Sequence, residues 1–118
     1  PARTVAPCKD TVKPRLSGLE LGKKAFRRST VLDYRLSEAA KVTVHVEKRT
    51  RARTHKWHYV QLSGKLTDKA TAGNNEVTIR RRFAGRKLAE GRYRLVLVAK
   101  DSAGNNSVVK RIGFSIKL

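Results

Sequence analysis

The stretch from Leu88 to Asn106 reads Leu-Ala-Glu-Gly-Arg-Tyr-Arg-Leu-Val-Leu-Val-Ala-Lys-Asp-Ser-Ala-Gly-Asn-Asn, and it joins a turn, a long apolar strand and a second turn. Tyr93 stands at the start of the strand, where its ring can enter a core and its hydroxyl can reach the backbone upstream. The run Leu95–Val98 is apolar at every position, as expected for a strand in the middle of a sheet. Gly104 and Asn105 are typical turn residues. The stretch therefore predicts a β-protein with a corner fixed by Tyr93.

Other segments alternate apolar and polar residues, which is typical of half-buried strands. The clearest is 42–46, where three valines alternate with Thr43 and His45. Similar patterns occur in the segments 31–36, 57–62, 77–82 and 108–118. Turn residues recur about every 8–12 positions, and no long window has a helical period. The sequence thus predicts an all-β protein, a single antiparallel β-sandwich of seven or eight strands. Ala25 and Phe26 are expected to carry the first strand onto the second sheet, 48–56 to form a hairpin loop, and 72–75 to form a turn.

Several short motifs carry a resemblance to a known kind of module. They are Leu36-Ser-Glu-Ala-Ala40, Ala72-Gly-Asn74, Leu88-x-x-Gly91-x-Tyr93, Ala99-x-Asp101, Gly104-Asn105 and Phe114-Ser-Ile116. From Pro14 onward the chain resembles the immunoglobulin-like or fibronectin type III-like β-sandwich modules of exported bacterial proteins, and it is similar to the Ig-like domains of the flagellar hook cap. The resemblance implies structural roles for Leu88, Gly91, Tyr93, Asp101 and Gly104, and brings no catalytic residues. Such scaffolds serve many functions, so function must be argued from surface chemistry.

Length and composition predict one domain. The 118 residues divide into an irregular linker, 1–13, and a folded domain, 14–118. The absence of Met predicts a processed product or part of a larger protein, and no apolar run approaches the ~18 residues that span a bilayer. Cys8 has no partner in the chain, which leaves a free thiol or a disulfide outside it. We expect an extracellular, secreted or cell-surface location.

The charge balance is the second strong signal. Lys and Arg number 28 against 9 Asp and Glu, for a formal net charge of +19 and a pI near 11.2. Such a charge attracts polyanions without specifying which kind. The candidate polyanion-binding residues are Arg49, Arg51, Arg53, Lys56, Trp57, Arg80, Arg82, Arg86, Lys87, Arg92 and Arg94. The side chains of these candidate residues either converge on one face of the fold or spread over both sheets.

Three functions are compatible with this surface. The first is a non-catalytic module that binds anionic cell-envelope polymers or acidic partner proteins through its Arg/Lys-rich faces, or that serves in display or adhesion. The second is a nucleic-acid-binding module that uses the basic and aromatic segment 49–57, because exposed aromatic rings can stack on bases. The third is an inert spacer. Trp57 is expected in the core, with a stacking platform as the alternative.

No pattern indicates catalysis or a cofactor. The chain has no G-x-S-x-G motif, and its few carboxylates are scattered, so that Glu38, Asp68, Glu76 and Asp101 are expected to cap turns. His45, His55 and His58 cluster in the sequence around one hairpin. A metal site needs three or four convergent ligands, so we expect these imidazoles to be solvated and the protein to hold no metal.

Overall fold

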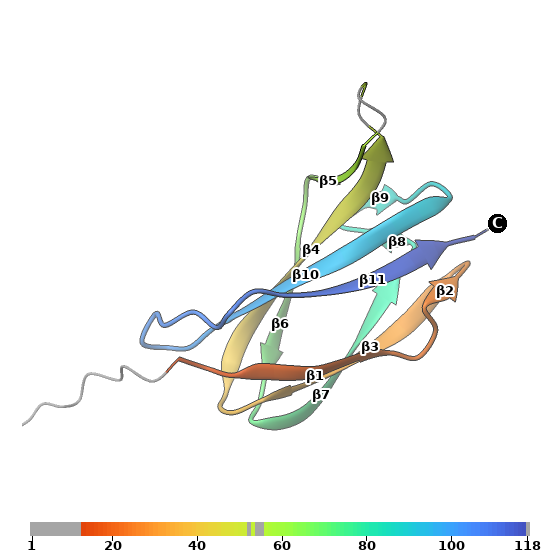
Figure 1. Cartoon of the computed structure of the whole chain (residues 1–118). Helices are drawn as coiled ribbons and strands as arrows, with labels where there is room; N and C mark the ends of the chain where they lie inside the picture. Colours follow the sequence, from red (N-terminus) through yellow and green to blue (C-terminus); the bar gives the residue numbers. More distant parts are fainter. Residues whose placement is uncertain (1–12, 52, 54–55, 118) are drawn as a thin grey trace, which may run out of the picture.

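The structure is a computed structural model that describes residues 13–51, 53 and 56–117, and these residues form eleven strands and no helix (Figure 1). The strands are β1 (Leu16–Leu21), β2 (Ala25–Phe26), β3 (Ser29–Leu36), β4 (Ala40–Arg51), β5 (Trp57–Gln61), β6 (Leu66–Ala70), β7 (Gly73–Arg80), β8 (Arg82–Phe83), β9 (Arg86–Lys87), β10 (Gly91–Lys100) and β11 (Lys110–Ile116). The protein is therefore all-β, as predicted. The predicted linker up to residue 12, with Cys8, and also His55, lie outside the described residues.

Two sheets lie over one core. The smaller sheet has the order β1-β3-β7, and the larger has the order β2-β11-β10-β4-β5. Strand β6 also pairs with β4, so that β5 and β6 follow one another along the same edge (Figure 1). Strands β8 and β9 form a separate two-stranded ribbon. Buried side chains from both large sheets make a single hydrophobic cluster.

The strand count and the strand directions differ from the prediction. There are eleven strands rather than seven or eight, because three segments of two residues form short ladders that leave no alternation in the sequence. Strand β2 also pairs with β11 in parallel, so the larger sheet is mixed rather than antiparallel. The predicted crossing is confirmed, since Ala25 and Phe26 belong to the larger sheet while β1 belongs to the smaller one.

Period-two alternation produces the core. On β3 every second residue is buried, from Thr30 to Leu36, and on β4 the three valines of 42–46 are buried. Strand β10 lies between β4 and β11, as its apolar run predicts, and buries alternate residues from Tyr93 to Ala99. Each fully buried Leu or Val side chain contributes about 1.5–3 kcal/mol. One face of each sheet is therefore fixed inward, and the other faces solvent.

Three boundaries differ from the predicted ones. Strand β4 continues to Arg51, through much of the segment predicted as a loop, because it stays paired with β5 after the last buried valine. The predicted turn at 72–75 is shorter, since β7 begins at Gly73. The last strand begins at Lys110 rather than Val108, whose side chain is 71% exposed.

The corner has the geometry expected from the sequence. Tyr93 is 2% exposed, and its hydroxyl donates a hydrogen bond of 2.6 Å to the Ala89 carbonyl. Its ring lies against Phe114 at 5.5 Å between centroids. Leu88 is buried and its amide donates to the Arg81 carbonyl, and Gly91 begins the strand. Burial raises the pKa of Tyr93, so the hydroxyl keeps its proton and the hydrogen bond at neutral pH.

A second tyrosine links the two sheets. Tyr34 on β3 is buried, and its hydroxyl donates a hydrogen bond of 2.6 Å to Oδ2 of Asp68 on β6. The prediction that Asp68 caps a turn is therefore wrong, because this carboxylate lies within a strand. Burial, and then the hydrogen bond to Asp68 and its negative charge, raise the pKa of Tyr34 well above its usual range. This contact joins the smaller sheet to the larger one.

Asp101 organises the turn after β10. Its Oδ1 accepts hydrogen bonds from the amides of Ala103 and Asn105 at 3.0 and 2.8 Å. Although burial opposes ionisation, these hydrogen bonds and those of the Asn105 side chain hold the pKa of Asp101 below its ordinary value. Gly104 has a φ of 88°, a conformation that favours glycine. The turn residues inferred from the sequence thus act together.

Candidate functional site

The outer face of the six-stranded sheet carries the largest group of the predicted residues. Because the valines of β4 point into the core, Arg49 and Arg51 point outward on the same strand. Their partners across the β4–β5 ladder are Tyr59 and Trp57, respectively. Strand β10 adds two outward arginines beside β4. We call this set the arginine–aromatic cluster: Arg49, Arg51, Trp57, Tyr59, Arg92 and Arg94.

Aromatic rings contact three of the four guanidinium groups of the cluster. The Cζ atoms of Arg49 and Arg51 lie 4.1 and 4.9 Å from the centroid of the Trp57 ring. That of Arg94 lies 3.9 Å from the centroid of the Tyr59 ring. Each such contact is worth about 0.5–1 kcal/mol at an exposed site. The rings therefore restrict the arginines before any ligand arrives, which lowers the entropy cost of binding.

Trp57 is not a core residue, so the leading prediction for it is wrong. Its side chain is 53% exposed. It begins β5, an edge strand, and pairs with Arg51 at the end of β4, well past the last buried valine. The hydrophobic core does not reach this end of the β4–β5 ladder, and the single apolar ring of Trp57 does not extend it. The alternative position, an exposed ring beside arginines, is the one observed.

One carboxylate enters the cluster and neutralises only one arginine. Arg94 Nε donates to Glu47 Oε1 in an ion pair whose side chains are 31% and 15% exposed. Within the described residues this is the sole ion pair, so Arg49, Arg51 and Arg92 have no carboxylate partner there. Arg49 Nε is covered and has no hydrogen-bond acceptor among the described atoms. The cluster thus retains an excess of positive charge.

A shallow depression of about 250 Å³ lies within this surface. Its lining includes Lys24, Arg49, Tyr59, Arg92 and Ser115, from strands β4, β5, β10 and β11 and the segment before β2. Lys24 has no local signal in the sequence, because its approach to the others depends on the parallel pairing of β2 with β11. A sulfate, carboxylate or phosphate group bound here would meet cations from several strands.

The remaining candidates do not join the cluster. Arg80 lies on β7 in the smaller sheet, and Arg82, Arg86 and Lys87 lie on the β8–β9 ribbon. Arg82 and Arg86 are hydrogen-bonded locally, to the Gly85 carbonyl and to Ser63 Oγ. Arg53 and Lys56 are exposed in the β4–β5 connection. Apart from the cluster, the candidate residues therefore divide among three parts of the fold.

Two rows of like charge also lie on opposite faces. Lys69, Lys41 and Lys100 occupy one register across β6, β4 and β10, which we call the lysine row. On the smaller sheet Glu20, Asp33 and Glu76 occupy one register across β1, β3 and β7, which we call the acidic row. The cap role predicted for Glu76 is wrong, because this residue lies within β7. Neither row could be read from the sequence, because each depends on the register of three separate segments.

The described histidines do not converge. His45 lies on the outer face of β4, whereas His58 pairs with Thr50 across the β4–β5 ladder and hydrogen-bonds to it, Nε2 to Oγ1, at 3.0 Å. Residues 13–51, 53 and 56–117 contain no group of three or more His, Cys, Asp or Glu side chains arranged to hold a metal ion. The same residues contain no helix long and apolar enough to cross a bilayer.

Comparisons with known proteins give a distant likeness only. No family model and no curated protein matches the chain. Among solved structures, it is similar to part of a family 76 glycoside hydrolase from a bovine Bacteroides thetaiotaomicron strain, at 15% identity and a TM-score of 0.49, over 89% of this chain and 20% of that one. It is also similar to part of the GH3 beta-glucosidase of Bifidobacterium adolescentis, at 15% identity and a TM-score of 0.34, over 86% of this chain and 17% of that one. The chain thus spans about a fifth of either enzyme.

Proposed function

We propose that this chain is an immunoglobulin-like β-sandwich module of an exported bacterial protein, that it has no catalytic activity, and that it binds anionic cell-envelope polymers through its arginine–aromatic cluster. Three features of the fold support the immunoglobulin-like assignment. Two sheets share one core, the chain crosses from the smaller sheet to the larger one between β1 and β2, and the Tyr93 hydroxyl donates a hydrogen bond to the Ala89 carbonyl at the corner. Similar corners occur in modules of that class.

The single observation that carries the binding proposal is the stacking of arginines on exposed rings. An ordinary surface arginine loses side-chain entropy when it binds a ligand. Here Arg49 and Arg51 already lie over Trp57, and neither has a carboxylate partner in the described residues. Guanidinium groups bind sulfate, phosphate and carboxylate in a planar, bidentate manner. The arrangement therefore suits charged groups that repeat along a polymer.

One observation favours a second candidate, a nucleic-acid-binding module. Trp57 is exposed beside the basic β4–β5 connection, and base stacking on such a ring is worth about 1–3 kcal/mol. Against this, guanidinium groups already lie within 4.1–4.9 Å of the ring centroid and compete with a base for its face. Charge recognition is therefore the stronger candidate.

Calorimetric titration of the protein with heparin and with alginate tests the proposal. The variant Arg49→Gln/Arg51→Gln removes two cluster cations, and Arg27→Gln/Arg28→Gln removes two exposed cations next to β2 as a charge-matched control. We expect the cluster variant to bind at least about tenfold more weakly than the control variant, because charged hydrogen bonds contribute about 1.5–3 kcal/mol each.

Other results would overturn the proposal. Equal losses in the two variants would mean that net charge alone attracts the polymer. Tighter binding of single-stranded DNA, with a preference for base composition that persists at about 0.2 M salt, would support the nucleic-acid module instead. No binding of any polymer at low salt would leave an inert spacer.

A further inference from the structure

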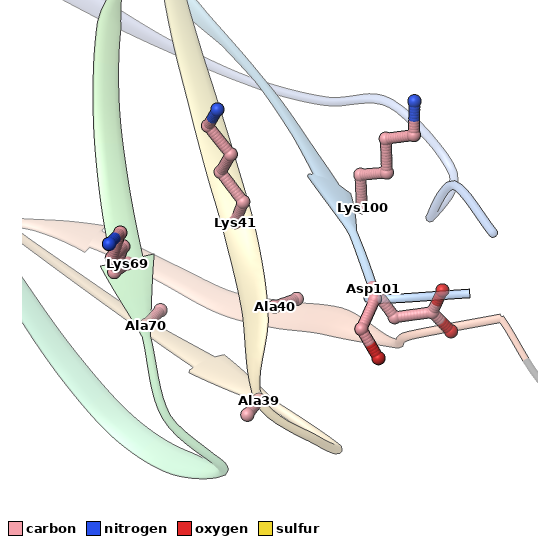
Figure 2. Close-up of a pocket in the computed structure, with 8 residues that line it drawn as sticks. Ala39, Ala40, Lys41, Lys69, Ala70, Lys100 and Asp101 are labelled. Atoms are coloured by element: carbon pink, nitrogen blue, oxygen red, sulfur yellow. The ribbon is translucent and has the colours of Figure 1, made fainter. Parts of the chain in front are cut away.

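The lysine row lies at the opposite end of the same outer face from the arginine–aromatic cluster. Lys41 is paired with Lys100 on one side and with Lys69 on the other. Figure 2 shows the three lysines on three neighbouring strands, with the Lys41 and Lys100 side chains directed away from the Asp101 carboxylate. That carboxylate accepts hydrogen bonds from the amides of Ala103 and Asn105 and from the Asn105 side chain.

Three like charges in one register have an unfavourable interaction. Opposed strand residues have Cβ atoms about 4.5–5.5 Å apart, and like charges directly opposite one another destabilise a sheet. None of the three lysines has an ion-pair partner in the part of the chain that the structure describes. A shallow depression of about 430 Å³ lies beside them and is lined by these lysines, Ala39, Ala40 and Ala70, with Asp101 and Ser102. An anion beside the three ammonium groups would relieve the repulsion.

We propose that the polymer bound by the cluster is a linear, flexible anionic polysaccharide that runs along the strands and is held at both ends of the face, by the arginine–aromatic cluster and by the lysine row. This inference rests on the proposed function and adds the shape and length of the ligand. Arg49 and Lys41 are eight residues apart on β4, which corresponds to about 27 Å at ~3.4 Å per residue. A ligand must reach that far to contact both sites.

The surface between the two sites permits such a path. The outward residues there include Thr43, His45, Val96 and Val98. The one acidic side chain on this part of β4 is Glu47, which is neutralised by Arg94. Three of the nine acidic residues of the chain form the acidic row on the opposite sheet, where they would repel the same polymer. The distribution of charge therefore favours this face over the other.

The shape of the face favours a flexible chain over a nucleic-acid duplex. Each strand twists about its own axis, which rotates neighbouring strands by about 20–25°, so two sites eight residues apart on β4 do not face in one direction. A DNA duplex has a persistence length of about 50 nm and cannot follow such a twist over ~27 Å without a cost in bending energy. A polysaccharide chain with rotatable glycosidic bonds can follow it.

Size-defined heparin fragments test the inference. Fragments shorter than about 27 Å when extended can contact one site, and longer ones can contact both. We expect the wild-type protein to bind long fragments at least about tenfold more tightly per chain than short ones, with a step near that length, because the second contact becomes intramolecular. Alginate and duplex DNA of matched length are the comparison ligands.

Two variants that lose the same charge distinguish a contact at the lysine row from a general effect of net charge. Lys41→Gln/Lys69→Gln/Lys100→Gln removes the lysine row, and Arg15→Gln/Arg35→Gln/Arg80→Gln removes three exposed cations associated with the smaller sheet. The first variant should bind short fragments like the second but lose the step with length. The slope of log K against log salt for long fragments should also fall by about one for each ammonium group that contacts the polymer.

The outcomes distinguish the two proposals. If short fragments bind and depend on Arg49 and Arg51, but affinity shows no step with length, the two-site inference is wrong and the proposed function stands. If short fragments do not bind at all, the proposed function fails. If the two triple variants behave alike with long fragments, the lysine row is not a contact. Tighter binding of the duplex than of heparin would overturn the assignment to a polysaccharide.

Discussion

Replacing Tyr34 by Phe removes one hydroxyl group and leaves the buried ring in place. The hydroxyl donates a hydrogen bond of 2.6 Å to Asp68, across the two sheets. Hydrogen bonds to charged groups contribute about 1.5–3 kcal/mol, and the half-buried Asp68 can regain some hydration, so we expect a loss of about 2 kcal/mol in the free energy of unfolding. For a chain of this size, about 4 °C per kcal/mol gives a fall of about 8 °C in Tm.

Tyr93→Phe is the matched control. It removes a hydroxyl from a similarly buried tyrosine, and this hydroxyl donates to a neutral carbonyl, so the expected loss is about 1 kcal/mol and about half the fall in Tm. Urea unfolding monitored by the fluorescence of Trp57 gives both free energies. A loss for Tyr34→Phe no larger than that for Tyr93→Phe would show that the link between the sheets does not stabilise the fold.

The difference between wild type and Tyr34→Phe should also depend on pH in the alkaline range. The pKa of Tyr34 is raised in the folded protein, whereas an unfolded tyrosine ionises near 10. Its contribution is therefore fully present below about pH 10 and is lost as the pH rises above it, by about 1.4 kcal/mol per pH unit, because the unfolded chain releases the proton first. A constant difference between about pH 9 and pH 11 would contradict the assigned hydrogen bond.

Three further predictions concern the turns and the exposed ring. Gly64→Ala should destabilise the fold by about 2 kcal/mol or more, because φ is +91° and the new Cβ would lie 2.6 Å from Ala84 Cβ. Gly85→Ala is the control: its φ is +82° but the space around it is open, so thermal melts should show a loss of about 1 kcal/mol. Asp101→Asn should make the free energy of unfolding depend less on pH in the acid range. The lowered pKa of the Asp101 carboxyl means that its ionised form stabilises the fold above about pH 4 and that this stabilisation is lost below it. Acid titration followed by circular dichroism measures the difference. Trp57→Ala should lower the free energy of unfolding in urea by no more than about 2 kcal/mol, because the ring is 53% exposed and the change removes two cation–π contacts. A loss of about 3–5 kcal/mol would return Trp57 to the core.

The sequence predicts those parts of the fold that burial determines. A strand with one face in the core must alternate, so the buried valines of β4 and the alternate residues of β10 could be recognised without coordinates. The corner was recognisable because Tyr93 needs a turn before it and an apolar strand after it. These features depend on neighbours in the sequence.

The parts that were missed depend on pairing between distant segments. Strand β4 continues past its last buried valine to Arg51, but residues that are fully buried on neither face give no alternation, so the pairing with β5 leaves no signal in the sequence. Residue type favours a core position for Trp57 and does not reveal that β5 lies at an edge. Residue type likewise favours a turn for Asp68, because its contact with Tyr34 depends on how two sheets align and leaves no local signal.

The candidate surface was predictable in part. Arg49 and Arg51 could be placed beside Trp57 because all three lie in one hairpin. Arg92 and Arg94 were recognised as basic, but their place next to Arg49 follows from the register of β10 with β4. The lysine row, from three separate segments, had no local signature.

The parallel pairing of β2 with β11 also bears on the response of the domain to mechanical force. The described chain begins at one end of β1 and leaves at the far end of β11, on the opposite side of the molecule (Figure 1). Tension between these ends acts along the strands, so the Ser115 amide to Lys24 carbonyl and Lys117 amide to Phe26 carbonyl hydrogen bonds are sheared together rather than opened in succession. A domain built in this way should withstand tension between these ends better than its thermal stability alone would suggest.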